Sequence, residues 1–228
     1  MIKNIFFDLD DTLFDFKMAE KTALAKTLTE MGVEPTEEIL SRYSIHNISQ
    51  WKRLELGEIT REQVKVNRYR LLFDEFGIDL SPEKATKIYE KHLSCGHWFI
   101  DGAPEILKAL YGNYRLYLVS NGSKKVQDGR LKSSGITKYF DEIFISEAMG
   151  FEKPNIEFFT YCFERIPDFS KGETVIVGDS LSSDIKGGIQ AGIKTVWFNP
   201  HHQQNTTALK PDYEICSLNE LTALLKFM

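Results

Sequence analysis

The sequence has few cysteines, no long apolar run and no surplus of basic residues. Its three cysteines, Cys95, Cys162 and Cys216, are far apart and form no Cys-x-x-Cys pair, which argues against a zinc site or a disulfide framework. No apolar stretch approaches the roughly 18 residues that a membrane span requires. The N-terminal apolar run turns acidic at Asp8, too early for the core of a signal peptide. We therefore expect a cytoplasmic protein with no membrane partner.

The charge balance excludes a further class of function. The 228 residues include 28 basic and 33 acidic side chains, for a formal net charge of -5, whereas nucleic-acid binding needs a basic surplus. Hydrophobic residues make up 42% and charged residues 27%, an ordinary globular balance that provides a sizeable core. The sequence shows no pattern typical of a protein-binding surface, so no protein partner is expected. The length is large for one domain and small for two.

Strand and helix patterns alternate over most of the chain. Short apolar runs typical of buried strands occupy residues 5–9, 115–120, 142–146 and 174–179, with weaker candidates at 195–198 and 213–216. Helical patterns separate them at residues 103–111, 124–134, 155–166 and 182–191. Such alternation predicts an α/β fold with a Rossmann-like parallel sheet, built from βαβ units with right-handed crossovers.

The segment after the first strand breaks this alternation. It contains no strand pattern but four helical ones, at residues 18–31, 36–55, 60–76 and 81–93. Residues 60–63 also fit a capping box. We therefore predict that an all-helical domain, residues 16–96, is inserted into a core formed by residues 1–15 and 97–228. The helical segment holds 13 basic and 13 acidic residues, so it carries no net charge.

Polar residues gather where the predicted strands end. In parallel sheets, ligands bind beyond the carboxyl ends of the strands. The residues at or just after these ends are Asp8, Asp10, Ser120, Asn121, Lys153, Asp179 and Asp184. Each feature taken alone has an ordinary explanation, because Asp-x-Asp and Ser-Asn-Gly are common in turns and a lysine is usually solvated. Their joint placement at one edge of the sheet favours a functional site.

The residue types at this edge suggest phosphoryl transfer. Asp8 and Asp10 are two residues apart, so an extended strand would place them on one face. Crowded carboxylates repel unless a cation or a proton intervenes, and a set of oxygen ligands without histidine or cysteine favours Mg²⁺. A carboxylate can attack phosphorus to form an aspartyl-phosphate, and a second carboxylate can protonate the leaving oxygen and then activate water.

These segments resemble the four motifs of the haloacid dehalogenase superfamily. The matching segments are Asp8-Leu9-Asp10-Asp11-Thr12-Leu13, Ser120-Asn121-Gly122, Lys153-Pro154 and Gly178-Asp179-x4-Asp184. The resemblance implies that Asp8 is the nucleophile and Asp10 the general acid/base. The dehalogenases proper lack an aspartate at position 10, so its presence indicates a phosphatase. The inserted helices resemble the family's cap, which closes over the site and selects substrate.

The resemblance also assigns roles to the remaining motif residues. Ser120, Asn121 and Lys153 would hold the phosphoryl group. Magnesium would be bound by the carboxylates of Asp8 and Asp179 and by the backbone carbonyl of Asp10, and Thr12 and Asp184 would support the site. These roles imply a magnesium-dependent phosphomonoesterase.

Further segments resemble the bacterial pyrimidine 5′-nucleotidases of this superfamily. They are Phe14-x-Phe16, Asn47-x3-Trp51, Gly57-x-Ile59-Thr60 and Trp197-x-Asn199-x-His201-His202. Phe14, Phe16 and Trp51 could stack on a base, and the Asn47 amide could pair with a pyrimidine edge. The alternative is that these side chains fill the core of the helical segment. The histidine pair lies in a polar loop and is expected to be structural.

Two other functions stay open at this point. The same core could serve a sugar-phosphate phosphatase or a phosphomutase. It could also be a non-catalytic phosphate-binding module, although the retention of Asp8, Asp10, Lys153 and Asp179 argues against that.

Overall fold

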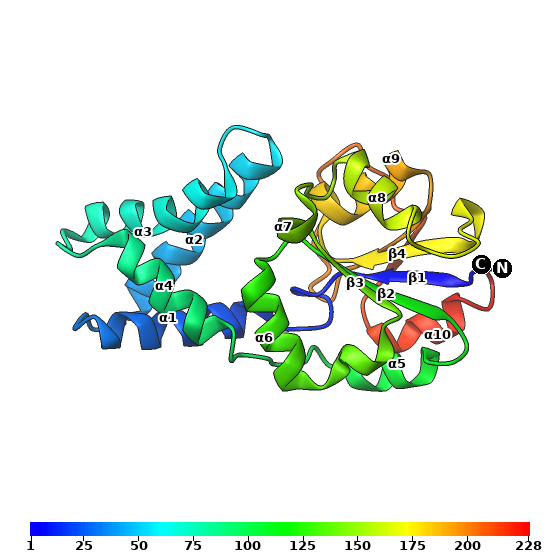
Figure 1. Cartoon of the computed structure of the whole chain (residues 1–228), viewed down its shortest axis with the longest axis horizontal. Helices are drawn as coiled ribbons and strands as arrows, with labels where there is room; N and C mark the ends of the chain where they lie inside the picture. The colour runs from blue at the N-terminus through cyan, green and yellow to red at the C-terminus, as the bar shows by residue number, and fades with distance from the viewer.

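The computed structural model describes all 228 residues and has a six-stranded parallel sheet between two layers of helices (Figure 1). The strands follow the order β3-β2-β1-β4-β5-β6, and every neighbouring pair is parallel. They are β1 (Asn4–Phe7), β2 (Arg115–Ser120), β3 (Glu142–Ile145), β4 (Thr174–Gly178), β5 (Lys194–Phe198) and β6 (Tyr213–Ile215). This is the doubly wound order of the Rossmann fold, which reverses direction between β1 and β4. The predicted fold class is therefore confirmed.

The helices fall into two groups. Four long helices follow β1 directly, namely α1 (Phe16–Glu30), α2 (Glu37–Glu55), α3 (Arg61–Phe76) and α4 (Pro82–Leu93). The others lie against the sheet or at its edge: α5 (Ala103–Leu110), α6 (Lys124–Ser134), α7 (Ser146–Met149), α8 (Ile156–Phe163), α9 (Lys186–Ala191) and α10 (Leu221–Leu224). Shorter turns are η1 (Ile136–Tyr139), η2 (Lys171–Glu173), η3 (Leu181–Ile185) and η4 (Leu218–Glu220). None of the helices is both long and apolar enough to cross a membrane.

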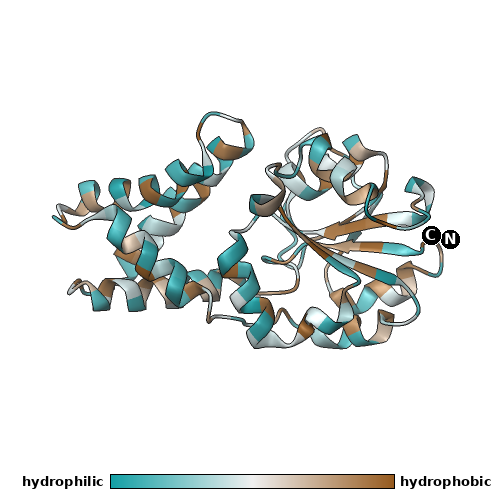
Figure 2. Cartoon of the chain, viewed as in Figure 1, coloured by the Kyte–Doolittle hydropathy of each residue, from teal (hydrophilic) through white to brown (hydrophobic).

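The sheet is buried on both faces because its strands are apolar on both sides. Ile5 and Phe7 of β1 belong to one hydrophobic cluster with α5 and α10, whereas Phe6 belongs to a second cluster with α8. All three side chains are completely buried. Figure 2 shows this pattern as hydrophobic stretches along the strands, with mixed colours on the helices. Such double burial is typical of parallel sheets.

Helices α1 to α4 surround a hydrophobic cluster of their own. Its fourteen buried residues come from these four helices, except for Val126 of α6. Side-chain caps begin each helix, and Thr60 forms the expected capping box with Gln63 at the start of α3. Figure 1 shows these helices as a separate lobe at the far end from the two termini. We call this lobe the helical unit and the remainder the sheet domain.

Two chain segments connect the helical unit to the sheet domain. They run beside each other, because Asp15 N donates to Trp98 O at 2.8 Å and Ile100 N donates to Leu13 O at 3.0 Å. The ring of Phe14 packs edge-on against Phe99, with 5.3 Å between the ring centres. The connection is therefore a short paired segment with a buried aromatic contact.

The structure differs from the predicted elements mainly at the functional edge of the sheet. Strand β1 ends at Phe7 instead of residue 9, so Asp8 already lies beyond the paired strands. The predicted helix at 182–191 begins as the π-helical turn η3 before α9. Ser146, expected to end a strand, begins the short helix α7. Local patterns did not show these irregular turns because long-range contacts stabilise them.

Candidate active site

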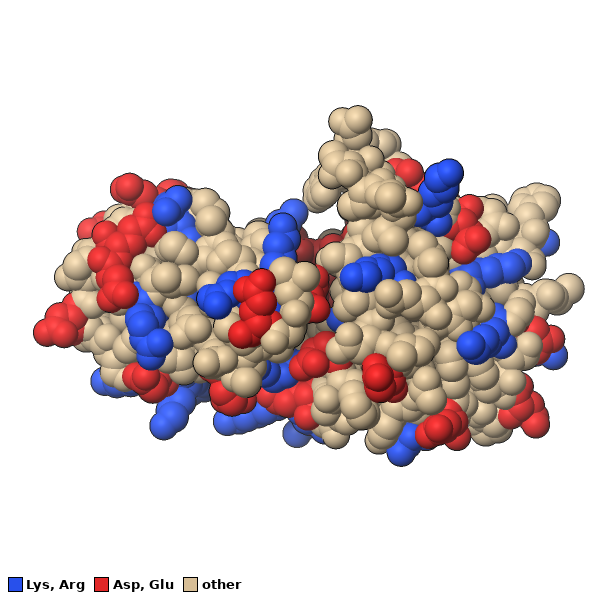
Figure 3. Space-filling model, turned by 90° about the horizontal axis from the view of Figure 1, so that it is seen from above, with Lys and Arg blue, Asp and Glu red and all other residues tan.

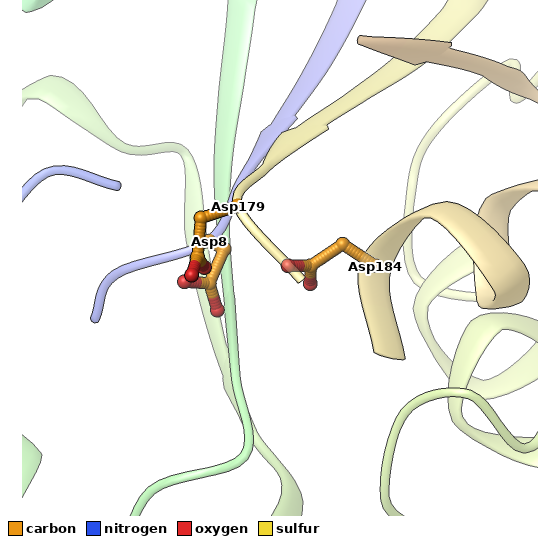
Figure 4. A group of neighbouring side chains, drawn as sticks. All are labelled: Asp8, Asp179 and Asp184. Carbon is orange, nitrogen blue, oxygen red and sulfur yellow. The ribbon is translucent and has the colours of Figure 1, made fainter. Parts of the chain in front are cut away.

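The site lies beyond the carboxyl ends of β1, β2 and β4, where the strand order reverses. Carboxylate oxygens of Asp8, Asp179 and Asp184 all lie within 4.8 Å of one another. Figure 4 shows Asp8 and Asp179 at the ends of adjacent strands, with Asp184 approaching from the following helical turn. Asp8 is far from Asp179 and Asp184 in the sequence, and the pairing of β1 with β4 brings it beside them.

A buried lysine lies between two of these carboxylates. Lys153 Nζ is 2.6 Å from Asp8 Oδ1 and 2.6 Å from Asp184 Oδ1, and it donates to Val119 O at 2.8 Å. Only 1% of the lysine is exposed. These three acceptors hold the ammonium group beside Asp8.

The loop after β4 is held by contacts from three directions. Asp179 N donates to Thr12 Oγ1 at 3.1 Å, and Trp197 Nε1 donates to Asp179 O at 2.8 Å. The residue before Asp179 is Gly178. A side chain at this position would clash with Asp184, because a Cβ atom there would lie 2.3 Å from Asp184 Oδ2. Thr12 and Asp184 therefore both contact the loop after β4.

Ser120 is the last residue of β2, and Asn121 begins the loop that faces these acids. Asn121 Nδ2 donates to Lys153 O at 2.8 Å, and Lys153 N donates to Asn121 Oδ1 at 2.9 Å. Gly122 N donates to Ser120 Oγ at 3.1 Å. The amide side chain of Asn121 therefore ties the serine loop to the lysine loop, which places both on one wall of the site.

Burial and the surrounding charges shift the pKa values of Asp8, Asp179 and Lys153. Burial raises the pKa of Asp8 most strongly, the Lys153 ammonium group lowers it, and the Asp184 and Asp10 carboxylates raise it again, so that it is about 8. Burial, followed by the charges of Asp8 and Asp184, also raises the pKa of Asp179 well above its usual value. Burial would lower the pKa of Lys153, but the two carboxylates outweigh burial and raise it. One ammonium group therefore does not balance the three carboxylates.

This arrangement fits a divalent cation. The donors are carboxylate oxygens with no nitrogen or sulfur ligand among them, which matches the preference of Mg²⁺. A cation at Asp8 and Asp179 would also relieve the repulsion that raises their pKa values. The Asp10 carboxylate lies outside the cluster, so any contact of residue 10 with the cation would come from its backbone carbonyl.

Asp10 instead points toward α6. Gln127 Nε2 donates to Asp10 Oδ2 at 2.7 Å, and Arg130 Nη1 donates to Asp10 Oδ1. The Asp10 side chain remains 27% exposed and lines the same cavity as Asp8. The sequence contained these two α6 residues at a spacing of three, but polar residues at that spacing are usual on any surface helix.

A cavity of about 280 Å³ extends from the acids to the helical unit, close to the lower limit of about 300 Å³ for small-ligand pockets. Figure 3 shows the hollow between the two lobes, with acidic side chains visible in it. On each of α2, α3 and α4, two residues one helical turn apart line the side of the cavity that the helical unit forms. The lining residues of the helical unit are Phe16, Trp51, Glu55, Lys65, Arg68, Glu90 and Leu93.

Of the four residues expected to touch the substrate, Phe16 and Trp51 line the cavity. Phe14 is completely buried against Phe99, and Asn47 is only 2% exposed. The Asn47 amide bonds to Glu20 Oε1 at 2.5 Å and accepts from Arg68 Nη1 at 3.0 Å. Direct substrate contact from Phe14 and Asn47 is thus corrected, because packing within the two lobes occupies both side chains.

The positions of Lys65, Arg68 and Glu90 were not singled out from the sequence. Lys65 Nζ lies 2.8 Å from Glu147 Oε1 of the sheet domain and 3.2 Å from Glu90 Oε1. Arg68 is buried against the Tyr89 ring, 4.7 Å from its centre. Lys65 and Arg68 are three residues apart on α3, so they share one face of that helix. Many solvated charges have the same spacing.

Comparisons with known proteins agree with this geometry. A family model described as haloacid dehalogenase-like hydrolase matches residues 5–198. The chain is 39% identical over 220 residues to the pyrimidine 5′-nucleotidase PynA of Streptococcus pneumoniae, covering 96% of this chain and 93% of that protein. It is 33% identical over 221 residues to the pyrimidine 5′-nucleotidase YjjG of Escherichia coli, covering 97% and 96%. The solved structure of the HAD-hydrolase YfnB from Bacillus subtilis, bound to magnesium, matches with a TM-score of 0.94 and 39% identity, covering 98% of each chain. The resemblance read from the motifs is thereby confirmed, and the chain belongs to the haloacid dehalogenase-like hydrolases.

Proposed function

We propose that this hydrolase is a magnesium-dependent phosphomonoesterase that acts on pyrimidine nucleoside 5′-monophosphates. The observation that carries the proposal is the contact of Lys153 with Asp8, at 2.6 Å, in a cavity that Asp10, Ser120 and Asp179 also line. A carboxylate nucleophile, a phosphate-neutralising cation and a second carboxylate are the parts that phosphoryl transfer through an aspartyl-phosphate requires.

The residues act in two steps. A carboxylate oxygen of Asp8 attacks phosphorus, the bond from phosphorus to the ester oxygen breaks, and Asp10 gives a proton to the leaving oxygen. Asp10 then takes a proton from water, which attacks phosphorus and breaks its bond to Asp8. Lys153, Ser120 and the backbone amides of the Ser120–Gly122 loop bind the phosphoryl oxygens in both steps.

Magnesium would be held by Asp8 and Asp179, with the backbone carbonyl of Asp10, and would neutralise charge on the phosphoryl group when bound. The solved structure of YfnB is bound to magnesium, which supports magnesium as the metal. Asp184 holds Lys153 and Thr12 holds Asp179 in place.

The lining of the helical unit supports a flat, uncharged leaving group. Lys65 is balanced by Glu90 and Glu147, and Arg68 is linked through Asn47 to Glu20. No unbalanced cation is therefore left in this part of the cavity for a second phosphate. The indole of Trp51 offers a stacking surface, with the Arg61 guanidinium 5.5 Å from the ring centre.

The polar groups in the same region support a base with an imide edge. Arg68 Nη2 has no hydrogen-bond partner, and the Glu90 carboxylate pairs only with Lys65. Lys65, Glu90 and Arg68 thus offer two donors and one acceptor. Uracil and thymine present the complementary set of two carbonyl oxygens and one N–H, whereas cytosine replaces a carbonyl with an amine. The names of PynA and YjjG support the same class of substrate.

A panel of phosphomonoesters with Mg²⁺ tests the proposal. We expect the highest kcat/KM for uridine and thymidine monophosphates, with lower values for cytidine and adenosine monophosphates and for sugar phosphates. A preference of about tenfold or more for a sugar phosphate would contradict the nucleotide assignment. Absence of phosphate release from every compound would instead indicate a binding module.

A further inference from the structure

The Asp10 carboxylate is held on both oxygens by α6. Gln127 Nε2 donates to Oδ2 at 2.7 Å, and Arg130 Nη1 donates to Oδ1. Each oxygen keeps a second lone pair, and 27% of the side chain is exposed toward the cavity. The direction of the carboxylate is therefore set by α6, while a substrate can still reach it.

The Gln127 side chain is itself held by Ser120 and Gly122, which belong to the proposed phosphate-binding segment. Its Nε2 also donates to Ser120 Oγ at 3.0 Å, and its Oε1 accepts from Arg130 Nη1 at 3.0 Å. The amide lies so close to Gly122 that a Cβ atom there would be 2.2 Å from Gln127 Nε2. One buried amide thus links Ser120 to Asp10.

Arg130 is completely buried and has a single acidic partner, Asp10. Its Nε donates to Gly96 O at 2.9 Å, at the end of the helical unit. Its guanidinium lies 5.1 Å and 5.8 Å from the ring centres of Phe14 and Phe16. Burying a charge is costly, and these contacts hold it in one place beside Asp10.

We propose that Gln127 and Arg130 are positioning residues that direct the Asp10 carboxylate toward the leaving oxygen of the substrate. This inference rests on the proposed function, in which Asp10 donates a proton to that oxygen. Positioned proton transfer contributes about 10²- to 10⁴-fold to a rate, and a displacement of about 1 Å can cost about 100-fold. Neither α6 residue needs to contact phosphorus for this role.

The dependence of the rate on the leaving group separates positioning from a general structural role. A nitrophenyl phosphate releases a stable phenolate and needs little protonation, whereas a nucleoside monophosphate releases an alkoxide and needs a proton. For Gln127→Met and Arg130→Lys, we expect kcat/KM, which reports the step that releases the leaving group, to fall about tenfold further on uridine monophosphate than on nitrophenyl phosphate. An equal loss on both substrates, or no loss, in a folded variant would overturn the inference.

Three comparisons make the result decisive. Lys132→Ala, an exposed residue of α6 without contacts to Asp10, should leave both rates unchanged. Thermal unfolding reports whether each variant folds, and Gln127→Met decides the test if Arg130→Lys does not fold.

Asp10→Asn must show the same leaving-group dependence. If it does not, or if the wild type releases no phosphate, the proposed function fails and the positioning inference fails with it. If Asp10→Asn shows the dependence and Gln127→Met does not, only the positioning inference fails.

Discussion

Lys153 Nζ and Asp8 Oδ1 lie 2.6 Å apart in the most crowded part of the site. The contact orients one oxygen of Asp8 toward the lysine, and the other oxygen is left free of side-chain hydrogen bonds. A phosphoryl group placed against that second oxygen would lie within reach of the ammonium group. In the proposed mechanism, the pair would therefore link the attacking carboxylate to a group that stabilises the charge on the phosphoryl group.

Asp8→Asn should abolish phosphate release while the fold remains intact. An amide cannot form the covalent intermediate, so kcat should fall by several orders of magnitude. Unfolding of the metal-free variant should occur at or above the wild-type temperature, because the substitution removes one of three crowded carboxylates. Phosphate assays and thermal unfolding check both parts. A variant that keeps more than about a tenth of the activity would refute the nucleophile assignment.

Removal of divalent cations should stop the reaction. Chelation with EDTA should reduce activity to the background rate, and added Mg²⁺ should restore it, because the cluster has only oxygen donors. The measurement is phosphate release before and after metal is returned. Restoration by Zn²⁺ with no response to Mg²⁺ would contradict the assignment.

Arg68→Met should weaken recognition of the base more than it affects the chemistry. We expect KM for uridine monophosphate to rise about tenfold, since a lost hydrogen bond to a charged group costs about 1.5–3 kcal/mol. The KM for nitrophenyl phosphate, which has no imide edge, should change little. Arg70→Ala is the matched control, because this arginine of α3 is exposed and bonds to Asn67. Equal changes of KM on both substrates would rule out base recognition by Arg68.

Glu147→Gln should lower stability at neutral pH and have less effect in acid. Burial would raise the pKa of Glu147, but its bonds with Lys65 and with Lys124 N outweigh burial and lower it below 4.5. The folded pKa is depressed, so this stabilisation is present above the unfolded value and is lost as the pH falls through the folded one. The expected difference at pH 7 is about 1 kcal/mol or less. Denaturant unfolding of both proteins between about pH 3 and pH 7 tests this, and a difference that does not shrink in acid would count against it.

Local sequence patterns were sufficient for much of the architecture. The apolar runs predicted strands such as β2 with its observed bounds, and the capping box predicted the start of α3. These features depend on neighbours within a few residues, where periodicity and capping act. The motif residues could be assigned for a similar reason, because parallel strands place their carboxyl ends at one edge of the sheet.

The residues around the motifs could not be assigned in this way. Asn47 and Phe14 were expected in the substrate pocket. Instead, Phe14 is buried against Phe99, and Asn47 is buried and bonds to Glu20. Gln127 and Arg130 looked like ordinary polar residues of an exposed helix, but both are buried beside Asp10. Helical spacing shows which residues share a face of a helix, but not which partner covers that face.

The sequence by itself determined the sheet, the inserted helices and the acids at the strand ends, because these depend on local periodicity and on the geometry of parallel strands. Only the tertiary structure decided which charges meet: Lys153 with Asp8 and Asp184, Arg130 with Asp10, and Lys65 with Glu147. Electrostatic contacts act over a few ångströms in space whatever the separation along the chain. The contact of Lys153 with Asp8, across 145 residues of sequence, therefore became visible only when the chain was folded.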